Sequence, residues 1–138
     1  MRAFVLVALA LVVGGSISAG VATGAAGQGR TALTITFWDE GQRTPDPVVW
    51  TLRCDPARGT HPRPELACRR LAAGGWKLVS PVPAGAICTE IYGGPQVARV
   101  VGMLEGRKVW ARFTRTNGCQ ISRWNKLSPW LLPAGGVR

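Results

Sequence analysis

Residues 54–71 read CDPARGTHPRPELACRRL, and this stretch decides how the rest of the chain is interpreted. Proline and glycine punctuate its first half, which predicts a loop from Asp55 to Pro62. Apolar side chains then recur at helical spacing and stop before a pair of glycines, which predicts a short helix from Arg63 to Ala73. The fold is therefore expected to combine a helix with the strands predicted on either side of it.

The N-terminal residues have the composition of a secretory signal peptide. A basic residue follows the initial methionine, an apolar run covers residues 4–13, and small residues come after it. The apolar run is too short to span a bilayer. We therefore expect a signal peptide over residues 1–26, with cleavage after Gly24 or Ala26. The product is then secreted and extracellular, with no membrane contact after cleavage.

The mature region is expected to form one domain over residues 27–138, with its core between about residues 31 and 132. This region contains all four cysteines of the chain: Cys54, Cys68, Cys88 and Cys119. Because export leads to an oxidising compartment, we expect them to form two disulfides. Such crosslinks matter in a small domain, since closing a loop of about 15 residues is worth roughly 3 kcal/mol in the chain-entropy model.

The chain is basic, with 17 lysines and arginines against 7 acidic residues and a formal net charge of +10 at pH 7. Such a charge favours acidic partners. The arginines are scattered along the chain, whereas a nucleic-acid groove requires clustered cations with interleaved aromatic residues. We therefore expect no nucleic-acid partner.

Five segments have the patterns of β-strands. Thr31 to Trp38 alternates apolar and polar residues, as a half-buried strand does, and Val48 to Leu52 predicts a second strand. Val97 to Leu104 and Lys108 to Thr114 are separated by a short turn that contains glycine, which predicts a hairpin. The apolar run Trp130 to Leu132 is predicted to be a final edge strand.

A second short helix is predicted from Asn117 to Leu127. Two helices and five strands in one domain predict an α+β fold with a five-stranded antiparallel sheet. No internal repeat interrupts this arrangement.

Three stretches together resemble the subtilisin inhibitor-like family, which comprises secreted serine protease inhibitors of actinomycete bacteria. Residues 54–71 contain a cysteine, the pattern Pro-x-x-Gly-x-His-Pro, four further residues, Ala-Cys and a following leucine. Residues 88–95 read CTEIYGGP and resemble the family's reactive loop, and residues 115–119 read RTNGC. The resemblance extends from about Thr31 to Leu132. It implies that the two helices pack on one face of the sheet and that the protein is a homodimer through the sheet.

The same resemblance implies a serine protease inhibitor that is not itself an enzyme. A rigid reactive loop would enter the protease like a substrate, and its residues would fill successive subsites: Ile87, Cys88, Thr89, Glu90, Ile91 and Tyr92. The bond presented to the nucleophile would be Glu90–Ile91. A loop that is already ordered loses little entropy on binding, which is the source of its affinity.

The supports of this loop are also implied by the resemblance. Together with the order of the cysteines along the chain, it favours disulfides Cys54–Cys68 and Cys88–Cys119. The second bridge would then fix the loop two residues before the scissile bond. The side chain of Asn117 would hydrogen-bond loop carbonyls from beneath.

Glu90 departs from the family pattern, because family members commonly carry Lys, Arg or Met before the scissile bond. A glutamate would face the aspartate of a trypsin-type pocket with water removed, so trypsin is expected to be a poor target. The expected target is therefore a subtilisin-type protease or a glutamyl-specific endopeptidase.

Other classes of function have weaker support in the sequence. His61 is the single histidine and is interpreted as a structural residue of a turn, without a nucleophile motif nearby. One histidine and four oxidised cysteines leave no ligand set for zinc, and we expect no metal or cofactor. Six tryptophans raise a sugar-binding role, which would need a coplanar row of exposed indoles. Of these, Trp50 and Trp110 are expected in the core or a dimer interface, and Trp38 and Trp76 at the surface. The alternative function is a non-inhibitory secreted domain that binds carbohydrate or another exported protein.

Overall fold

The computed structural model describes residues 31–135. The signal peptide expected over residues 1–26 lies outside the described residues. Within the described residues, no helix is long and apolar enough to cross a membrane.

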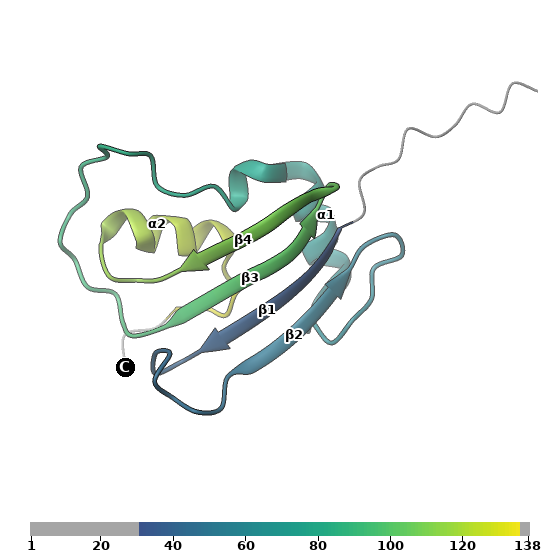
Figure 1. Cartoon of the computed structure of the whole chain (residues 1–138), viewed down its shortest axis with the longest axis horizontal. Coiled ribbons are helices and arrows are strands. Elements are labelled where there is room, and N and C mark those ends of the chain that lie inside the picture. The colour runs from purple at the N-terminus through teal and green to yellow at the C-terminus, as the bar shows by residue number, and fades with distance from the viewer. Residues whose placement is uncertain (1–30, 136–138) are drawn as a thin grey trace, which may run out of the picture.

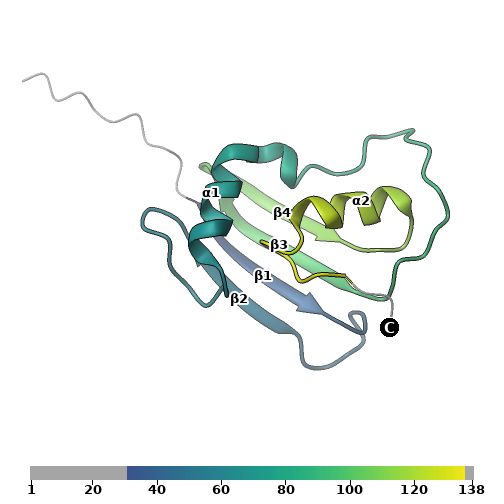
Figure 2. The ribbon, with the colours of Figure 1, turned by 180° about the vertical axis from the view of Figure 1, so that it is seen from behind.

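A four-stranded antiparallel sheet forms one layer, in the order β2-β1-β3-β4. The helices and the segment that follows α2 form the second layer, and both helices cover the same face of the sheet (Figures 1 and 2). The elements are β1 (Ala32–Trp38), β2 (Val48–Arg53), α1 (Pro64–Gly74), the 3-10 helix η1 (Gly75–Leu78), β3 (Val97–Leu104), β4 (Arg107–Phe113) and α2 (Gly118–Leu127). The two helices, the first two strands and the hairpin lie where the sequence predicts them, to within two residues.

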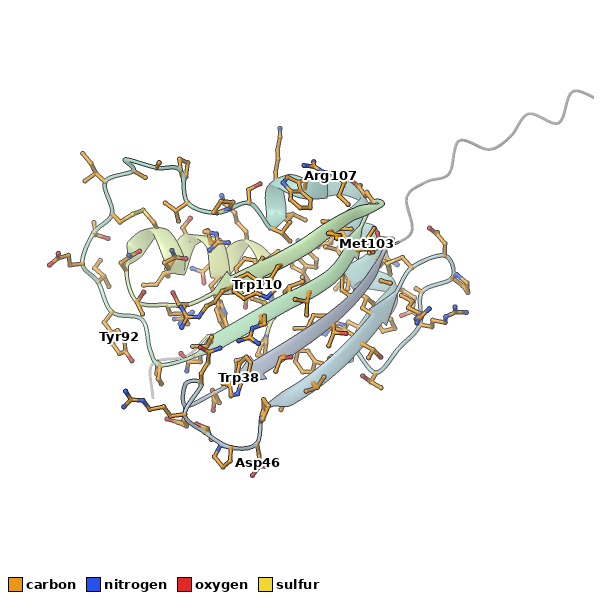
Figure 3. All side chains as sticks on the ribbon, viewed as in Figure 1. Trp38, Asp46, Tyr92, Met103, Arg107 and Trp110 are labelled. Atoms are coloured by element: carbon orange, nitrogen blue, oxygen red, sulfur yellow. A yellow bond between two sulfur atoms is a disulfide. The ribbon has the colours of Figure 1, made fainter. Side chains whose placement is uncertain are left out.

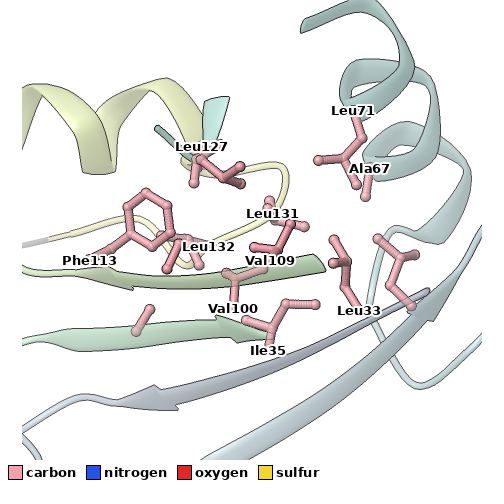
Figure 4. Packing of buried hydrophobic residues seen from close by; sticks show 14 of the residues in the cluster. Leu33, Ile35, Ala67, Leu71, Val100, Val109, Phe113, Leu127, Leu131 and Leu132 are labelled. Atoms are coloured by element: carbon pink, nitrogen blue, oxygen red, sulfur yellow. The ribbon is translucent and has the colours of Figure 1, made fainter. Parts of the chain in front are cut away.

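The sheet contributes its inward-facing residues to the core. In β1 every second residue is buried, and Leu33 and Ile35 point toward the helices (Figure 4). Ile35 pairs with Val100 of β3, and Val100 in turn pairs with Ala111 of β4, so one buried row crosses three strands. This alternation explains why the period-two pattern of the sequence predicted the strands.

The helices close the core from the other side. α1 contributes Ala67 and Leu71, and α2 contributes Trp124 and Leu127, all of which are at most 1% exposed. Figure 4 shows Leu127 and Leu71 above the sheet, with Leu131 between the layers. The second helix, α2, follows β4 and lies over the β4 side of the sheet (Figure 2). The first turn of α2 therefore lies beside the exposed segment between η1 and β3.

The predicted fifth strand is wrong. Trp130, Leu131 and Leu132 are 3%, 0% and 1% exposed, so three consecutive side chains are buried, whereas an edge strand buries every second one. The backbone N–H groups of Leu131 and Leu132 both donate to the carbonyl of Leu127, at 2.8 and 3.1 Å. The chain therefore turns back from the end of α2 into the core, and within residues 31–135 the sheet has four strands.

Candidate functional site

The segment between η1 and β3 covers residues 79–96 and forms no helix or strand. It runs along the outside of α2 and returns to the start of β3 (Figure 1). Ile87 is fully exposed, and Ile91 and Tyr92 are 61% and 62% exposed. Tyr92 points away from the sheet and into solvent (Figure 3). Large apolar side chains at such exposure contribute nothing to the core, which makes this segment the candidate contact surface.

A disulfide fixes the segment at Cys88. Cys88 bonds to Cys119 in the first turn of α2, and their Cα atoms are 5.3 Å apart. The structure also pairs Cys54 with Cys68, so the bridges join the partners that the family resemblance implies.

A backbone hydrogen bond holds the next residue. The N–H of Gly118 donates to the carbonyl of Thr89 at 2.8 Å. A β-carbon at Gly118 would collide with the Thr89 hydroxyl, so the missing side chain at Gly118 leaves room for the Thr89 side chain as it lies here.

Arg115 holds the segment on its other side, at Gly93. The N–H of Gly93 donates to the Arg115 carbonyl at 2.7 Å, and the Arg115 side chain returns a hydrogen bond from Nε to the Gly93 carbonyl at 3.0 Å. Arg115 is only 6% exposed. The Ile121 side chain packs directly on Gly93, since a β-carbon there would lie 2.8 Å from Cδ1 of Ile121.

Between these supports the described chain forms no internal hydrogen bonds. Among the described residues, Glu90, Ile91 and Tyr92 make no hydrogen bond to another residue, and all three are exposed. They form a three-residue bridge from Thr89 to Gly93, and both of its ends are fixed to residues 115–119. This arrangement presents three consecutive exposed side chains between two fixed ends.

Asn117 has a different partner from the one expected. Its Oδ1 accepts a hydrogen bond from the backbone N–H of Gln120 at 3.0 Å and so caps the N-terminus of α2. No hydrogen bond from its side chain to a loop carbonyl is formed among the described residues. Asn117 instead fixes the start of the helix that presents Gly118 and Cys119 to the loop.

Sequence reasoning missed the contribution of Arg115 and of the Gly118 backbone. Both belong to the RTNGC stretch that carried part of the family resemblance, but only Asn117 and Cys119 were given roles there. The signal that points to them is the glycine pair at 93 and 94, which marks a close backbone approach without naming its partner.

Comparisons with known proteins identify the family to which this chain belongs. The model of the subtilisin inhibitor-like family matches residues 29–117, which is more than half of the chain. This protein belongs to the subtilisin inhibitor-like family. The matched segment includes the candidate loop and ends at Asn117, one residue before α2 begins.

Individual relatives support the assignment. Subtilisin inhibitor-like protein 1 of Streptomyces cacaoi is 38% identical over 77 residues, which cover 53% of this chain and 69% of that protein. The subtilase-type protease inhibitor of Streptomyces fradiae is 36% identical over 90 residues and 63% of either chain. The solved complex of Streptomyces caespitosus sermetstatin with Bacillus licheniformis subtilisin matches with a TM-score of 0.50 and 31% identity, over 77% of this chain and all of that chain.

His61 has the structural role expected of it. It is 4% exposed, its Nδ1 accepts from the N–H of Arg63 at 3.1 Å, and Nε2 therefore carries the proton and donates to the Leu131 carbonyl at 3.1 Å. Its ring also packs edge-on against Trp50, with centroids 5.3 Å apart. The ring thus connects the first disulfide region to the buried C-terminal segment, far from the candidate loop.

The tryptophans do not form a row of exposed rings. Trp124 and Trp130 are buried, and Trp38, Trp50 and Trp76 are half-buried, so the expected exposure of Trp38 and Trp76 is only partial. Trp110 is 68% exposed on the outer face of the sheet and not in the core (Figure 3). The guanidinium of Arg99 lies 5.7 Å from its ring centroid, so a cation already packs beside this ring.

Arg123 packs α2 against the start of the segment 79–96 and has no hydrogen bond to residues 87–92 within the described chain. Its Nε donates to the Ser80 carbonyl at 3.0 Å, its Nη1 donates to the Arg112 carbonyl at 3.1 Å, and its guanidinium lies 4.5 Å from the Phe113 ring centroid. Burial lowers the pKa of Arg123 from its usual value. Ser80 precedes the candidate loop by several residues and is not part of residues 87–92.

Proposed function

We propose that this protein is a secreted inhibitor of serine proteases, with residues 87–92 as its reactive loop and Glu90–Ile91 as the bond presented to the protease. Membership of a protease inhibitor family supports the class of function. The observation that carries the site is the exposed strip from Glu90 to Tyr92, which is supported at both ends and has no hydrogen bond to the rest of the described chain between them.

The proposed mechanism follows from the two supports. The protease serine attacks the Glu90 carbonyl carbon, its Oγ forms an ester, and the bond to the Ile91 nitrogen breaks as the catalytic histidine protonates that nitrogen. In an ordinary substrate the new amine diffuses away and water takes its place. Here Thr89 and Gly93 stay attached to residues 115–119, so the amine remains beside the ester and re-forms the peptide bond.

The charge of Glu90 defines the proposed targets. A trypsin pocket ends in an aspartate, which would face Glu90 with like charge and little water. A broad subtilisin-type pocket accommodates a glutamate that stays partly hydrated, and a glutamyl-specific pocket matches its charge. We therefore propose a subtilisin-type or glutamyl-specific protease as the partner, and the positive net charge of +10 favours one with an acidic surface.

We also propose that the protein is a homodimer through the outer face of the sheet. Trp110 is 68% exposed there, and Val49, on the same face by the strand register, is 50% exposed. Exposed apolar residues on an open sheet are stabilised when a second sheet covers them. Sedimentation of Trp110→Glu beside the wild type tests this, because a monomer in both cases would contradict it.

The inhibitor proposal is tested by titration of the oxidised mature domain against subtilisin, a glutamyl-specific endopeptidase and trypsin, with Glu90→Lys as the matched variant. We expect the wild type to block one of the first two at near-stoichiometric ratios, and Glu90→Lys to move inhibition to trypsin. Failure of both forms against all three proteases would reject the reactive loop and favour a non-inhibitory secreted binding domain.

A further inference from the structure

Arg115 is an unusual residue for the position that it occupies. Arginine is rarely buried unless its charge is paired or hydrogen-bonded, yet Arg115 is only 6% exposed. Its guanidinium packs 5.9 Å from the Trp124 ring centroid and so tight against Gly135 that a β-carbon there would collide with Nη1. Its side chain donates a hydrogen bond to Gly93, beside the candidate loop. Within the described chain, the hydrogen bond of this buried guanidinium therefore goes to one residue beside the loop.

Gly93 lies on the leaving side of the proposed scissile bond. Cleavage of Glu90–Ile91 would leave the new amine at Ile91, two residues from Gly93 and so within about 7 Å of that support along an extended chain. Without the Arg115 side chain, Gly93 is left with one bond to this residue, from its N–H to the Arg115 backbone carbonyl at 2.7 Å. When that single bond opens, the segment that carries the amine becomes longer than two residues.

Tether length decides whether the bond re-forms. The effective concentration of the amine at the ester falls as the segment that carries it lengthens. On the other side of the bond, Cys88 and Thr89 are held by the disulfide and by Gly118, independently of Arg115. The two halves of the cleaved loop therefore have separate supports, and the leaving half is held at Gly93 by the backbone and by the side chain of Arg115.

We propose that Arg115 is a positioning residue of the inhibitor, which holds Gly93 so that the amine of Ile91 stays in place after cleavage. This inference rests on the proposed function. In the acyl-enzyme, the Ile91 nitrogen attacks the Glu90 ester, gives its proton back to the catalytic histidine and releases the serine. Water in its place yields the free Glu90 carboxylate and a cleaved inhibitor. Arg115 thus acts on the competition between amine and water and touches neither directly.

The test compares Arg115→Met with Arg123→Met, which removes an arginine of α2 that has no hydrogen bond to residues 87–93 within the described chain. Each folded variant is incubated with a catalytic amount of the inhibited protease, and intact and cleaved chains are separated at equilibrium. We expect the ratio of cleaved to intact inhibitor to rise about tenfold or more in Arg115→Met, the effect of losing one hydrogen bond from a charged donor. Arg123→Met is expected to keep the wild-type ratio. Equal ratios in all three proteins would overturn the proposal.

Two further variants separate positioning from charge and from stability. Arg115→Lys keeps the charge but has no donor at the Nε position, so we expect it to be cleaved like Arg115→Met. Gly93→Ala leaves Arg115 in place but sets a β-carbon 3.3 Å from Cβ of Arg115 and closer still to Ile121, so it is expected to be cleaved as well. Wild-type behaviour of Arg115→Lys would assign the effect to charge and contradict the clamp.

A second readout distinguishes failure of this inference from failure of the proposed function. If the wild type inhibits none of the proteases, the proposed function fails. Whether the Arg115 side chain holds Gly93 in place is then measured by hydrogen exchange at the Gly93 amide, which donates to the Arg115 carbonyl. Exchange at least tenfold faster in Arg115→Met than in Arg123→Met would support positioning, and equal exchange would overturn it.

Discussion

The two disulfides share one chemistry but hold different kinds of structure. Cys54 and Cys68 join the end of β2 to α1, and both pack against the hydrophobic core. Cys88 and Cys119 join an exposed segment to the first turn of α2, away from the main core cluster. The first bridge connects elements that also hold each other by apolar contact, whereas the second connects a loop that has few contacts of its own.

This contrast shows that the value of a crosslink depends on what else orders its ends. Sequence separations of 14 and 31 residues predict stabilisations of about 3 and 4 kcal/mol in the chain-entropy model. The chain-entropy model counts only the entropy that each crosslink removes from the unfolded chain, so the two bridges differ in it by loop length alone. Around the candidate loop, however, the second bridge also removes freedom that binding would otherwise have to remove. Its loss is expected to affect function as well as stability.

The largest effect is expected for the double variant Cys88→Ser with Cys119→Ser. The loop would then be ordered only on binding, which moves up to about 4 kcal/mol from folding to association and weakens inhibition by about a hundredfold to a thousandfold. Inhibition titration at a temperature where circular dichroism shows a folded chain measures this. Unchanged inhibition would mean that Gly118 and Arg115 suffice to order the loop.

The complementary double variant, Cys54→Ser with Cys68→Ser, is expected to lose about 3 kcal/mol of unfolding free energy. Inhibition by the folded fraction should stay as in the wild type, because this bridge touches no loop residue. Denaturant unfolding followed by tryptophan fluorescence gives the first quantity, and titration in the cold gives the second. A large loss of inhibition at full folding would erase the distinction between the two regions.

The smallest effect is expected at Asn117, and it sharpens the comparison. Asn117→Ala removes the cap of α2 and should cost about 1 kcal/mol of stability, with a modest loss of inhibition because α2 carries Cys119. Asn117→Asp keeps the capping oxygen but loses the amide donor. Thermal unfolding and titration of both variants decide between roles: if the Asn117→Asp variant fails to inhibit although its stability is kept, a direct bond from the amide to the loop operates in the complex.

Much of the fold follows from local patterns in the sequence. The alternation in β1, the turn at 105–106 and the glycine stop after α1 each reflect a constraint that acts within a few residues. The conformation of Trp130–Leu132 was not predictable, because a short apolar run has no periodicity that separates a strand from a buried irregular segment. Its burial depends on the carbonyl of Leu127 and on the space left between the layers, and both are tertiary features.

The candidate site divides in the same way. The resemblance to a family proposed the loop and implied the disulfide partners, and the structure forms both of those disulfides. The reciprocal contact between Gly93 and Arg115 was not predictable, because it joins residues 22 positions apart and half of it is made by backbone. No side-chain pattern encodes such a contact.

The exposed strip and its supports are made by two separate sets of residues. Glu90, Ile91 and Tyr92 have no hydrogen bond within the described chain, and residues 115–119, which fix their neighbours, do not need any particular side chain at those three positions. Under the proposed function, substitutions in the strip are therefore expected to alter which enzyme is recognised, with little penalty for folding. Selection is free to retarget such a scaffold rapidly, one exposed position at a time, while its frame stays constant.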